Sequence, residues 1–208
     1  MAEEDKEKTP VDYYTHSLQY LVDIELMLGN MDQAKNEIEK GFRLLKSSNN
    51  INIRADLNLV YCEYYYIKGE LEKMMEKTLA AQRYFKQSGS EEGLAKCENN
   101  LGIYHYFKGE HKKARTHFER SLNLKEKIDD ERGMANSYMH LGLVNWYLVE
   151  YEKSIENMKN SLRLFESVGD KRRVSSVYLN LSTIYKSFGD IENAVECNRR
   201  SIKIKREV

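Results

Sequence analysis

Proline is almost absent from this sequence, and its absence leaves little to interrupt a helix. Pro10 is the only proline among the 208 residues, so beyond it only glycine and short polar clusters can end a helix. Runs of β-branched residues, which a buried parallel strand requires, are also missing. Tyrosine, leucine, glutamate, lysine and asparagine dominate instead. We therefore expect an all-α protein.

The sequence also has no excess of charge and no long apolar run. Its 33 lysines and arginines match 33 aspartates and glutamates, so no global field attracts nucleic acid or an acidic membrane surface. No apolar stretch approaches the roughly 18 to 20 residues of a membrane span. The acidic, lysine-rich start MAEEDKEKTPVDYY lacks the apolar core of a signal peptide. We expect a cytoplasmic protein whose partners are neither nucleic acid nor membrane.

Recognisable catalytic and metal-binding motifs are missing as well. The sequence has no P-loop, dinucleotide-binding, serine-hydrolase or zinc-protease motif. Its three cysteines are odd in number and lack the spacing of metal ligands. No two of its five histidines lie four residues apart. We expect no metal, no cofactor and no enzymatic activity.

What the sequence does contain is a repeat of 40 residues. The segment NLGIYHYFKGE aligns column by column with HLGLVNWYLVE and NLSTIYKSFGD, each 40 residues further on. Gly102 lies inside a helical stretch, where glycine costs about 1 kcal/mol relative to alanine. Because small residues dominate its column, we interpret Gly102 as a point where two helices approach closely. The column contains Val22, Cys62, Gly102, Gly142 and Ser182.

Each unit reads as two antiparallel helices joined by a tight turn. One pair is expected at about residues 131–147 and 151–167. Suitable N-cap residues precede the first helices, namely Asp129, Asp130, Asp170 and either Ser88 or Ser90.

The repeat pattern divides the chain into a short tail and one repeat domain. We expect residues 1–10 to be disordered, because this acidic, lysine-rich start has almost nothing to bury. Residues 11–208 are expected to form the repeat domain. Its five repeats lie near residues 12–47, 52–87, 92–127, 132–167 and 172–206.

These units resemble the tetratricopeptide repeat, whose pattern is a bulky residue followed by Leu-Gly, Tyr, Gly-x-Tyr, Ala, Phe and Ala. The fourth unit carries Tyr138, Leu141, Gly142, Tyr151, Ser154, Met158 and Ser161 in these roles, and the third carries Leu101, Gly102, Gly109, Ala114, Phe118 and Ser121. The units are longer than the common one of about 34 residues and lack its terminal proline. In this they resemble the long-unit branch found in kinesin light chains, G-protein-signalling modulators and Rap-type peptide receptors. The resemblance implies a right-handed α-solenoid of about five antiparallel helix pairs.

The resemblance also implies protein or peptide recognition in a concave groove lined by the first helix of each pair. Residues two and five positions before and after the Leu-Gly leucine leave the core face, so they are candidates to line this groove. The candidates combine apolar, aromatic and polar side chains. They are Tyr66, Lys96, Asn99, Ile103, Tyr106, Asn136, Met139, Leu143, Trp146, Leu179, Thr183 and Lys186.

Several of these residues have a second interpretation. Tyr106 and Trp146 could instead pack between neighbouring first helices, as aromatic residues at helical spacing often do. Asn99 could hydrogen-bond a peptide backbone or face solvent. Lys96 and Asn100 hint at the carboxylate clamp of the family, although a convincing partner lysine is missing.

Two further segments leave alternatives open. A basic stretch on a second helix could meet an acidic partner or be a solvated face, and it contains His111, Lys112, Lys113, Arg115 and His117. The tyrosine-rich segment YCEYYYIKGE has a spacing that suits packing, with phosphorylation as the alternative.

The leading hypothesis for function is a scaffold whose groove binds a peptide or helix of another protein. The alternative is a regulatory sensor subunit that responds to a short signalling peptide. The segment NRRSIKIKREV lacks the extra capping helix that the family often has, and Ile202 and Ile204 lie in it. We therefore expect weak self-association through the C-terminal helix pair.

Overall fold

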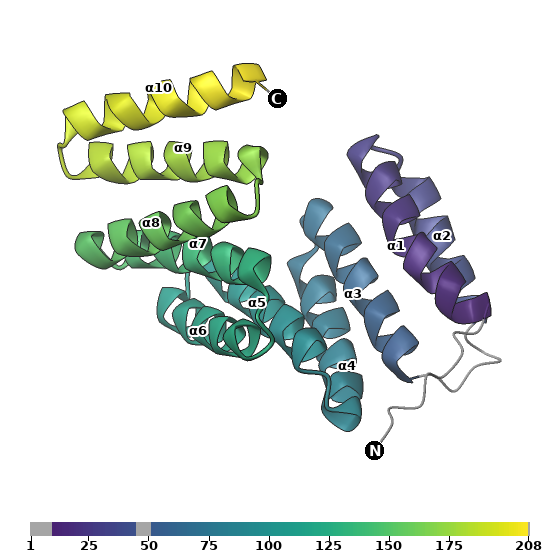
Figure 1. Cartoon of the computed structure of the whole chain (residues 1–208). Helices are drawn as coiled ribbons and strands as arrows, with labels where there is room; N and C mark the ends of the chain where they lie inside the picture. Colours follow the sequence, from purple (N-terminus) through teal and green to yellow (C-terminus); the bar gives the residue numbers. More distant parts are fainter. Residues whose placement is uncertain (1–9, 45–50, 208) are drawn as a thin grey trace. The chain divides into compact units, whose positions relative to one another are not determined.

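The structure is a computed structural model that describes residues 10–44 and 51–207, with side chains from residue 17 onward. In these residues it consists of ten α-helices and contains no β-strand, which confirms the all-α prediction (Figure 1). The helices are α1 (Pro10–Met27), α2 (Met31–Leu44), α3 (Ile51–Ile67), α4 (Leu71–Ser88), α5 (Glu91–Phe107), α6 (His111–Lys127), α7 (Glu131–Tyr147), α8 (Tyr151–Ser167), α9 (Lys171–Ser187) and α10 (Ile191–Glu207). None of the described helices is long and apolar enough to cross a membrane.

The helix boundaries follow the 40-residue period. The first helices α3, α5, α7 and α9 begin at residues 51, 91, 131 and 171. Helix α1 begins at Pro10, and the rest of the predicted disordered tail, residues 1–9, lies outside the described residues. The handedness of the superhelix stays a prediction.

The chain divides into two compact units, with the boundary between Asn100 and Leu101 inside α5. In the first unit, α1 packs against α2 and α3, and α3 packs against α4. The core between α1, α2 and α3 is apolar, and its largest fully buried residues are Leu18, Val22, Ile38, Leu57 and Val60.

The second unit contains the antiparallel pairs α7–α8 and α9–α10, which run side by side in Figure 1. Helix α9 lies against both α7 and α8. The core that joins these pairs includes Met158, Phe165, Val177, Leu181 and Ile184, none of which is more than 3% exposed. Neighbouring repeats therefore share one continuous core here.

Glycines in the first helices allow the close approach that the sequence predicts. A Cβ atom on Gly102 would lie 2.5 Å from Cε1 of Phe118 on α6, and one on Gly142 would lie 2.8 Å from Cε of Met158 on α8. Any larger residue would push the two helices of a pair apart. The interpretation of Gly102 is confirmed.

Small hydroxyl residues on the second helices serve the same approach. Ser154 Oγ donates a hydrogen bond to the carbonyl of Gly142 at 2.7 Å, and Ser161 Oγ donates to the carbonyl of Ala135 at 2.8 Å. Both serines are completely buried, so each hydroxyl needs a partner inside the core. These bonds tie α8 to α7 along its length.

The first helices of the third, fourth and fifth pairs have side-chain N-caps. Asp130 Oδ1 accepts from the backbone N–H of Gly133 at 2.8 Å, and Asp170 Oδ1 accepts from that of Arg173 at 3.1 Å. Ser90 Oγ accepts from Gly93 N–H at 3.1 Å. The predicted N-cap Asp129 is instead the residue before the cap, with a left-handed φ of 54°.

The turn between the two helices of a pair needs a left-handed residue. Glycine occupies this position in four repeats, and Val149 occupies it in the fourth with a φ of 63°. A β-branched residue is strained in this conformation. The turn is thus dictated by the helix pair and imposed on Val149.

Candidate functional site on the first helices

The twelve candidate groove residues fall in both units, and their exposure differs. In the first unit Tyr66 is 44% exposed, Lys96 is exposed and Asn99 is half-buried. In the second unit Leu179, Thr183 and Lys186 are exposed, Met139 is buried, and the remainder are half-buried. The half-buried set is Ile103, Tyr106, Asn136, Leu143 and Trp146.

Three of the candidates lie in the seam between the fourth and fifth repeats. Met139, Leu143 and Trp146 all pack in the core cluster that α9 contributes to. Trp146 Nε1 also donates a hydrogen bond to Ser187 Oγ at the end of α9, at 2.9 Å. For Trp146, the interpretation as packing between neighbouring first helices therefore describes its contacts.

The seam between the third and fourth repeats is built in the same way. Ile103 and Tyr106 pack against a core cluster that contains Leu141 and Val144 of α7. The Tyr106 ring meets that of Tyr147 edge to face, with centroids 5.4 Å apart. Tyr106 thus joins α5 to α7, and its role in partner binding stays a prediction.

An exposed apolar column one residue beyond Tyr106 and Trp146 is absent from the twelve candidates. It contains Met27, Ile67, Phe107 and Tyr147, which are 81%, 50%, 54% and 48% exposed. These residues lie 40 positions apart, so the repeat itself could have revealed the column. A recurring exposed apolar position marks a surface better than a recurring half-buried one.

In the second unit this column forms an aromatic surface. Phe107 lies 5.5 Å from the Tyr106 ring, and Tyr147 stacks on His111 with centroids 4.6 Å apart. Trp146 lies 4.8 Å from Tyr147. We call Phe107 and Tyr147, joined through Tyr106, the aromatic surface.

The equivalent face of the first unit is acidic. Asp23 of α1 and Glu63 of α3 occupy the repeat position of Ile103 and Leu143. Although Glu63 is exposed as a residue, partial loss of water around its carboxyl and contact with the Asp23 carboxyl raise the pKa of Glu63 to about 7. The two units therefore present different chemistry at the same repeat position.

The predicted polar contacts in the third repeat have partners within the protein. Lys96 Nζ forms an ion pair with Glu92 at 2.6 Å. The side chain of Asn100 hydrogen-bonds the Cys62 thiol. The hint of a carboxylate clamp gains no support from these contacts.

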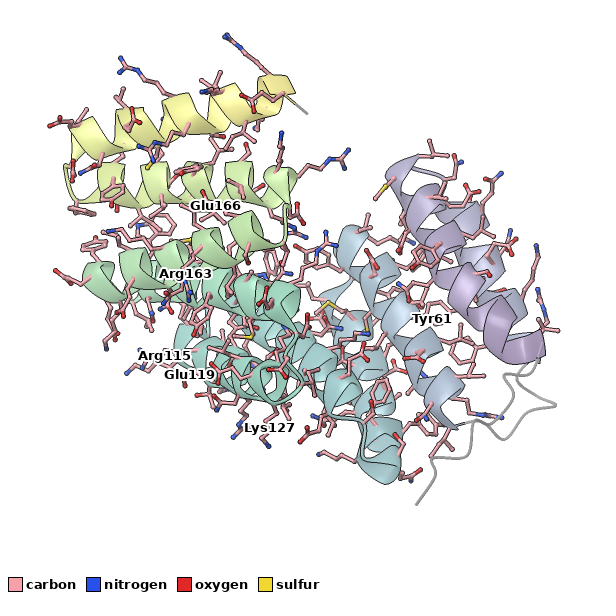
Figure 2. All side chains as sticks on the ribbon, viewed as in Figure 1. Tyr61, Arg115, Glu119, Lys127, Arg163 and Glu166 are labelled. Atoms are coloured by element: carbon pink, nitrogen blue, oxygen red, sulfur yellow. The ribbon has the colours of Figure 1, made fainter. Side chains whose placement is uncertain are left out.

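The basic stretch of α6 is interleaved with acidic partners. Arg115 forms an ion pair with Glu150 at 3.0 Å, and Lys113 forms one with Glu110 at 2.9 Å. Figure 2 shows Arg115 and Glu119 next to each other on α6. This mixed-charge face favours the interpretation as a solvated surface.

The tyrosine-rich segment of α3 packs inside the first unit. Tyr61 lies 5.5 Å from both Phe42 of α2 and Tyr65, and Figure 2 shows it facing the α1–α2 pair. Burial raises the pKa of Tyr61 to about 12, with Glu39 and neighbouring tyrosines adding to it. These contacts favour the packing interpretation.

The cysteines have no reactive environment. Burial raises the pKa of the Cys62 thiol to about 11 and that of Cys97 to about 12, so both are protonated at neutral pH. Among the residues that the structure describes, no three histidine, cysteine, aspartate or glutamate side chains come together to hold a metal ion.

Comparison with protein families decides the relationship. Residues 94–128 and 133–207 match two sequence profiles that are both described as the tetratricopeptide repeat, and together they cover more than half of the chain. The chain belongs to the tetratricopeptide-repeat family. The helix pairs described above are therefore tetratricopeptide repeats of a 40-residue form.

Solved structures share this fold at low sequence identity. BtubC from P. vanneervenii is 18% identical with a TM-score of 0.79, and the match covers 95% of this chain and 82% of that one. A kinesin light chain of nearly identical tetratricopeptide-like repeats from Podosopora anserina is 12% identical with a TM-score of 0.69, covering 94% and 97%. At these identities the likeness concerns the fold.

A third solved structure is the Rap conjugation gene regulator of the plasmid pLS20 in complex with the Phr* peptide. It is 19% identical with a TM-score of 0.77, and the match covers all of this chain and 59% of the regulator. The chain thus spans little more than half of that protein. A search of curated protein sequences gives no significant match.

Proposed function

We propose that this tetratricopeptide-repeat chain is a protein-interaction scaffold that binds a peptide or helix of a partner protein along its first helices. The aromatic surface carries the proposal, because Phe107 and Tyr147 are about half exposed on adjacent first helices. Half-exposed aromatic rings give large contact areas at little cost in side-chain entropy. The polar candidates Asn136, Thr183 and Lys186 lie on the first helices of the same unit.

Family membership supports this proposal. Tetratricopeptide arrays use their stacked helices as extended binding surfaces, and the solved Rap regulator holds a peptide. Because the regulator is 19% identical to this chain, its peptide is not carried over residue by residue. What is carried over is the class of ligand, a short segment of polypeptide.

A regulatory sensor is the second candidate function. It is favoured by the likeness to the Rap regulator, in which a signalling role would accompany peptide binding. A scaffold is expected to bind without changing its own conformation, whereas a sensor is expected to change it. Hydrogen exchange measured with and without a bound peptide separates the two.

The proposal further includes a cytoplasmic location and the absence of catalysis, metal and cofactor. Equal numbers of acidic and basic residues support partners other than nucleic acid and membrane. The raised thiol pKa values of Cys62 and Cys97 support the absence of nucleophilic chemistry.

Selection from a phage-displayed peptide library tests the proposal, because it needs no identified partner. The wild-type chain is expected to select peptides with at least one large apolar residue, and Tyr147→Ala is expected to weaken their binding at least tenfold. Lys159→Ala, on the exposed face of α8, is the control and should bind as the wild type does. Selected peptides that bind Tyr147→Ala unchanged would place the binding surface elsewhere.

A further inference from the structure

The exposed face of α1 is the face that other first helices bury against the preceding repeat. In α7 this face includes Leu141 and Val144, which are 5% and 0% exposed. The residues 120 positions earlier are Leu21 and Ile24 of α1, and they are 40% and 53% exposed. Together with Leu28, which is 68% exposed, they form what we call the α1 face. In the described residues this face has no helix packed on it.

The α9–α10 pair exposes the opposite half of the same seam. On the fourth repeat, Met139, Ile155 and Leu162 lie in the core cluster to which α9 contributes. Their counterparts 40 residues later are exposed, and they are Leu179 at 37%, Val195 at 42% and Ile202 at 51%. We call these three residues the α10 face. It has the composition of a surface that receives another first helix.

The two faces also carry opposite charge. Residues 10–44, which form α1 and α2, contain six aspartates and glutamates against three lysines and arginines. Residues 171–207, which form α9 and α10, contain nine lysines and arginines against four aspartates and glutamates. This complementarity favours contact between unlike faces and disfavours contact between like ones.

We propose that the α1 face of one copy of this chain packs on the α10 face of a second copy. The contact repeats between molecules the seam that joins α9 to α7 and α8 within the second unit. In that seam Tyr151 meets Phe188 at 5.4 Å, and the equivalent residues Ile191 and Leu28 are both apolar and exposed. The interface is heterologous, so each copy keeps one free face and the association is open-ended.

A pair of complementary variants tests this arrangement. Ile24→Lys places a positive charge on the α1 face, and Ile202→Glu places a negative charge on the α10 face. Each variant keeps one intact face, and both substituted residues are exposed, so the fold should persist and circular dichroism checks it. Phe107→Lys is the matched control, because Phe107 is 54% exposed and belongs to neither face.

Sedimentation velocity over a hundredfold range of concentration gives the readout. The wild type and Phe107→Lys are expected to show average mass rising with concentration and falling with added salt, because the opposed charges become screened. Each complementary variant alone should remain a monomer, at least tenfold weaker in association. An equimolar mixture of the two should form a dimer and nothing larger, because only one productive pair of faces remains.

Other outcomes overturn the proposal. A wild-type chain that stays monomeric at the highest concentration shows that the faces do not bind each other. If Ile202→Glu alone still dimerises, the contact joins two α1 faces, and if Ile24→Lys alone does so, it joins two α10 faces. Loss of association in Phe107→Lys would shift the contact to the aromatic surface.

Discussion

At the residue scale, Val149 shows how the helix pair imposes a conformation that its sequence does not favour. Val149 takes the left-handed φ that Gly29, Gly69, Gly109 and Gly189 take in the other repeats. We expect Val149→Gly to raise the free energy of unfolding by about 0.5–1 kcal/mol, because relief of backbone strain exceeds the extra entropy of an unfolded glycine. Urea denaturation measures the change.

The reciprocal substitution is the control for Val149. A Cβ atom on Gly109 would meet nothing within 4 Å, so Gly109→Val should lower the free energy of unfolding by backbone strain alone, about 1 kcal/mol. Equal stability of both variants and the wild type would contradict the argument from strain.

Gly142 tests the close approach of α7 and α8. Gly142→Leu should lower the free energy of unfolding by about 2 kcal/mol or more, because even its Cβ would lie 2.8–2.9 Å from carbons of Met158. Adding Met158→Ala should recover part of this loss by making room. The exposed control Lys153→Leu should change the midpoint little, and equal midpoints for Gly142→Leu and Lys153→Leu would show that the contact is not tight.

His140 makes stability depend on pH. Its burial and the nearby cations Lys125 and Arg173 lower the pKa of His140 to about 3. In the unfolded chain the pKa is about 6.5, so the unfolded state binds the proton first as pH falls. The stability contributed above pH 6.5 is lost below it, by up to about 1.4 kcal/mol per pH unit.

Denaturation at pH 7 and pH 5 measures this effect. His140→Phe keeps a ring beside Phe118, whose centroid lies 4.7 Å from that of His140, and it cannot bind a proton. The loss of stability between the two pH values should be smaller in this variant than in the wild type. An identical loss would assign the pH dependence to other groups.

At the scale of the helices, the sequence predicted the pairs and their contacts well, and the seams less well. The 40-residue period located the helix pairs because each first helix must place a small residue such as Gly102 or Gly142 against its partner. It did not reveal that Met139 and Leu143 face the next repeat. Spacing on one helix defines a face, but which neighbour covers that face depends on how consecutive pairs stack.

The aromatic surface was missed for a related reason. Phe107 and Tyr147 follow Tyr106 and Trp146 directly in the sequence, yet one helical position turns a side chain by about 100°. Trp146 therefore lies in the seam, whereas Tyr147 is 48% exposed. Their equal apolar character gave no sign of this difference.

The hydrogen bond from Trp146 to Ser187 joins α7 to α9. We expect Trp146→Phe to lower the free energy of unfolding, partly because this bond is lost, and Ser187→Ala to remove the same bond. A double-mutant cycle should give a coupling energy of about 0.5–1 kcal/mol. A coupling near zero would show that Trp146 does not tie the two repeats together.

At the scale of the whole molecule, stacked repeats leave three kinds of surface with separate roles. The seams are closed by Met139 and Trp146, the aromatic surface is open to a partner, and the α1 and α10 faces are open to a second copy. Binding and self-association thus use different residues, so variants of one surface leave the other intact.

The central claim is that a partner segment docks on the aromatic surface, and titration of a library-selected peptide tests it most directly. Trp146 lies 4.8 Å from Tyr147 and is the only tryptophan, so its fluorescence reports occupancy. The account predicts a saturable shift in emission, with affinity reduced at least tenfold in Phe107→Ala and Tyr147→Ala, about 1.4 kcal/mol or more each, and unchanged in Lys159→Ala. Wild-type affinity in both aromatic variants, with the fold intact, would contradict it.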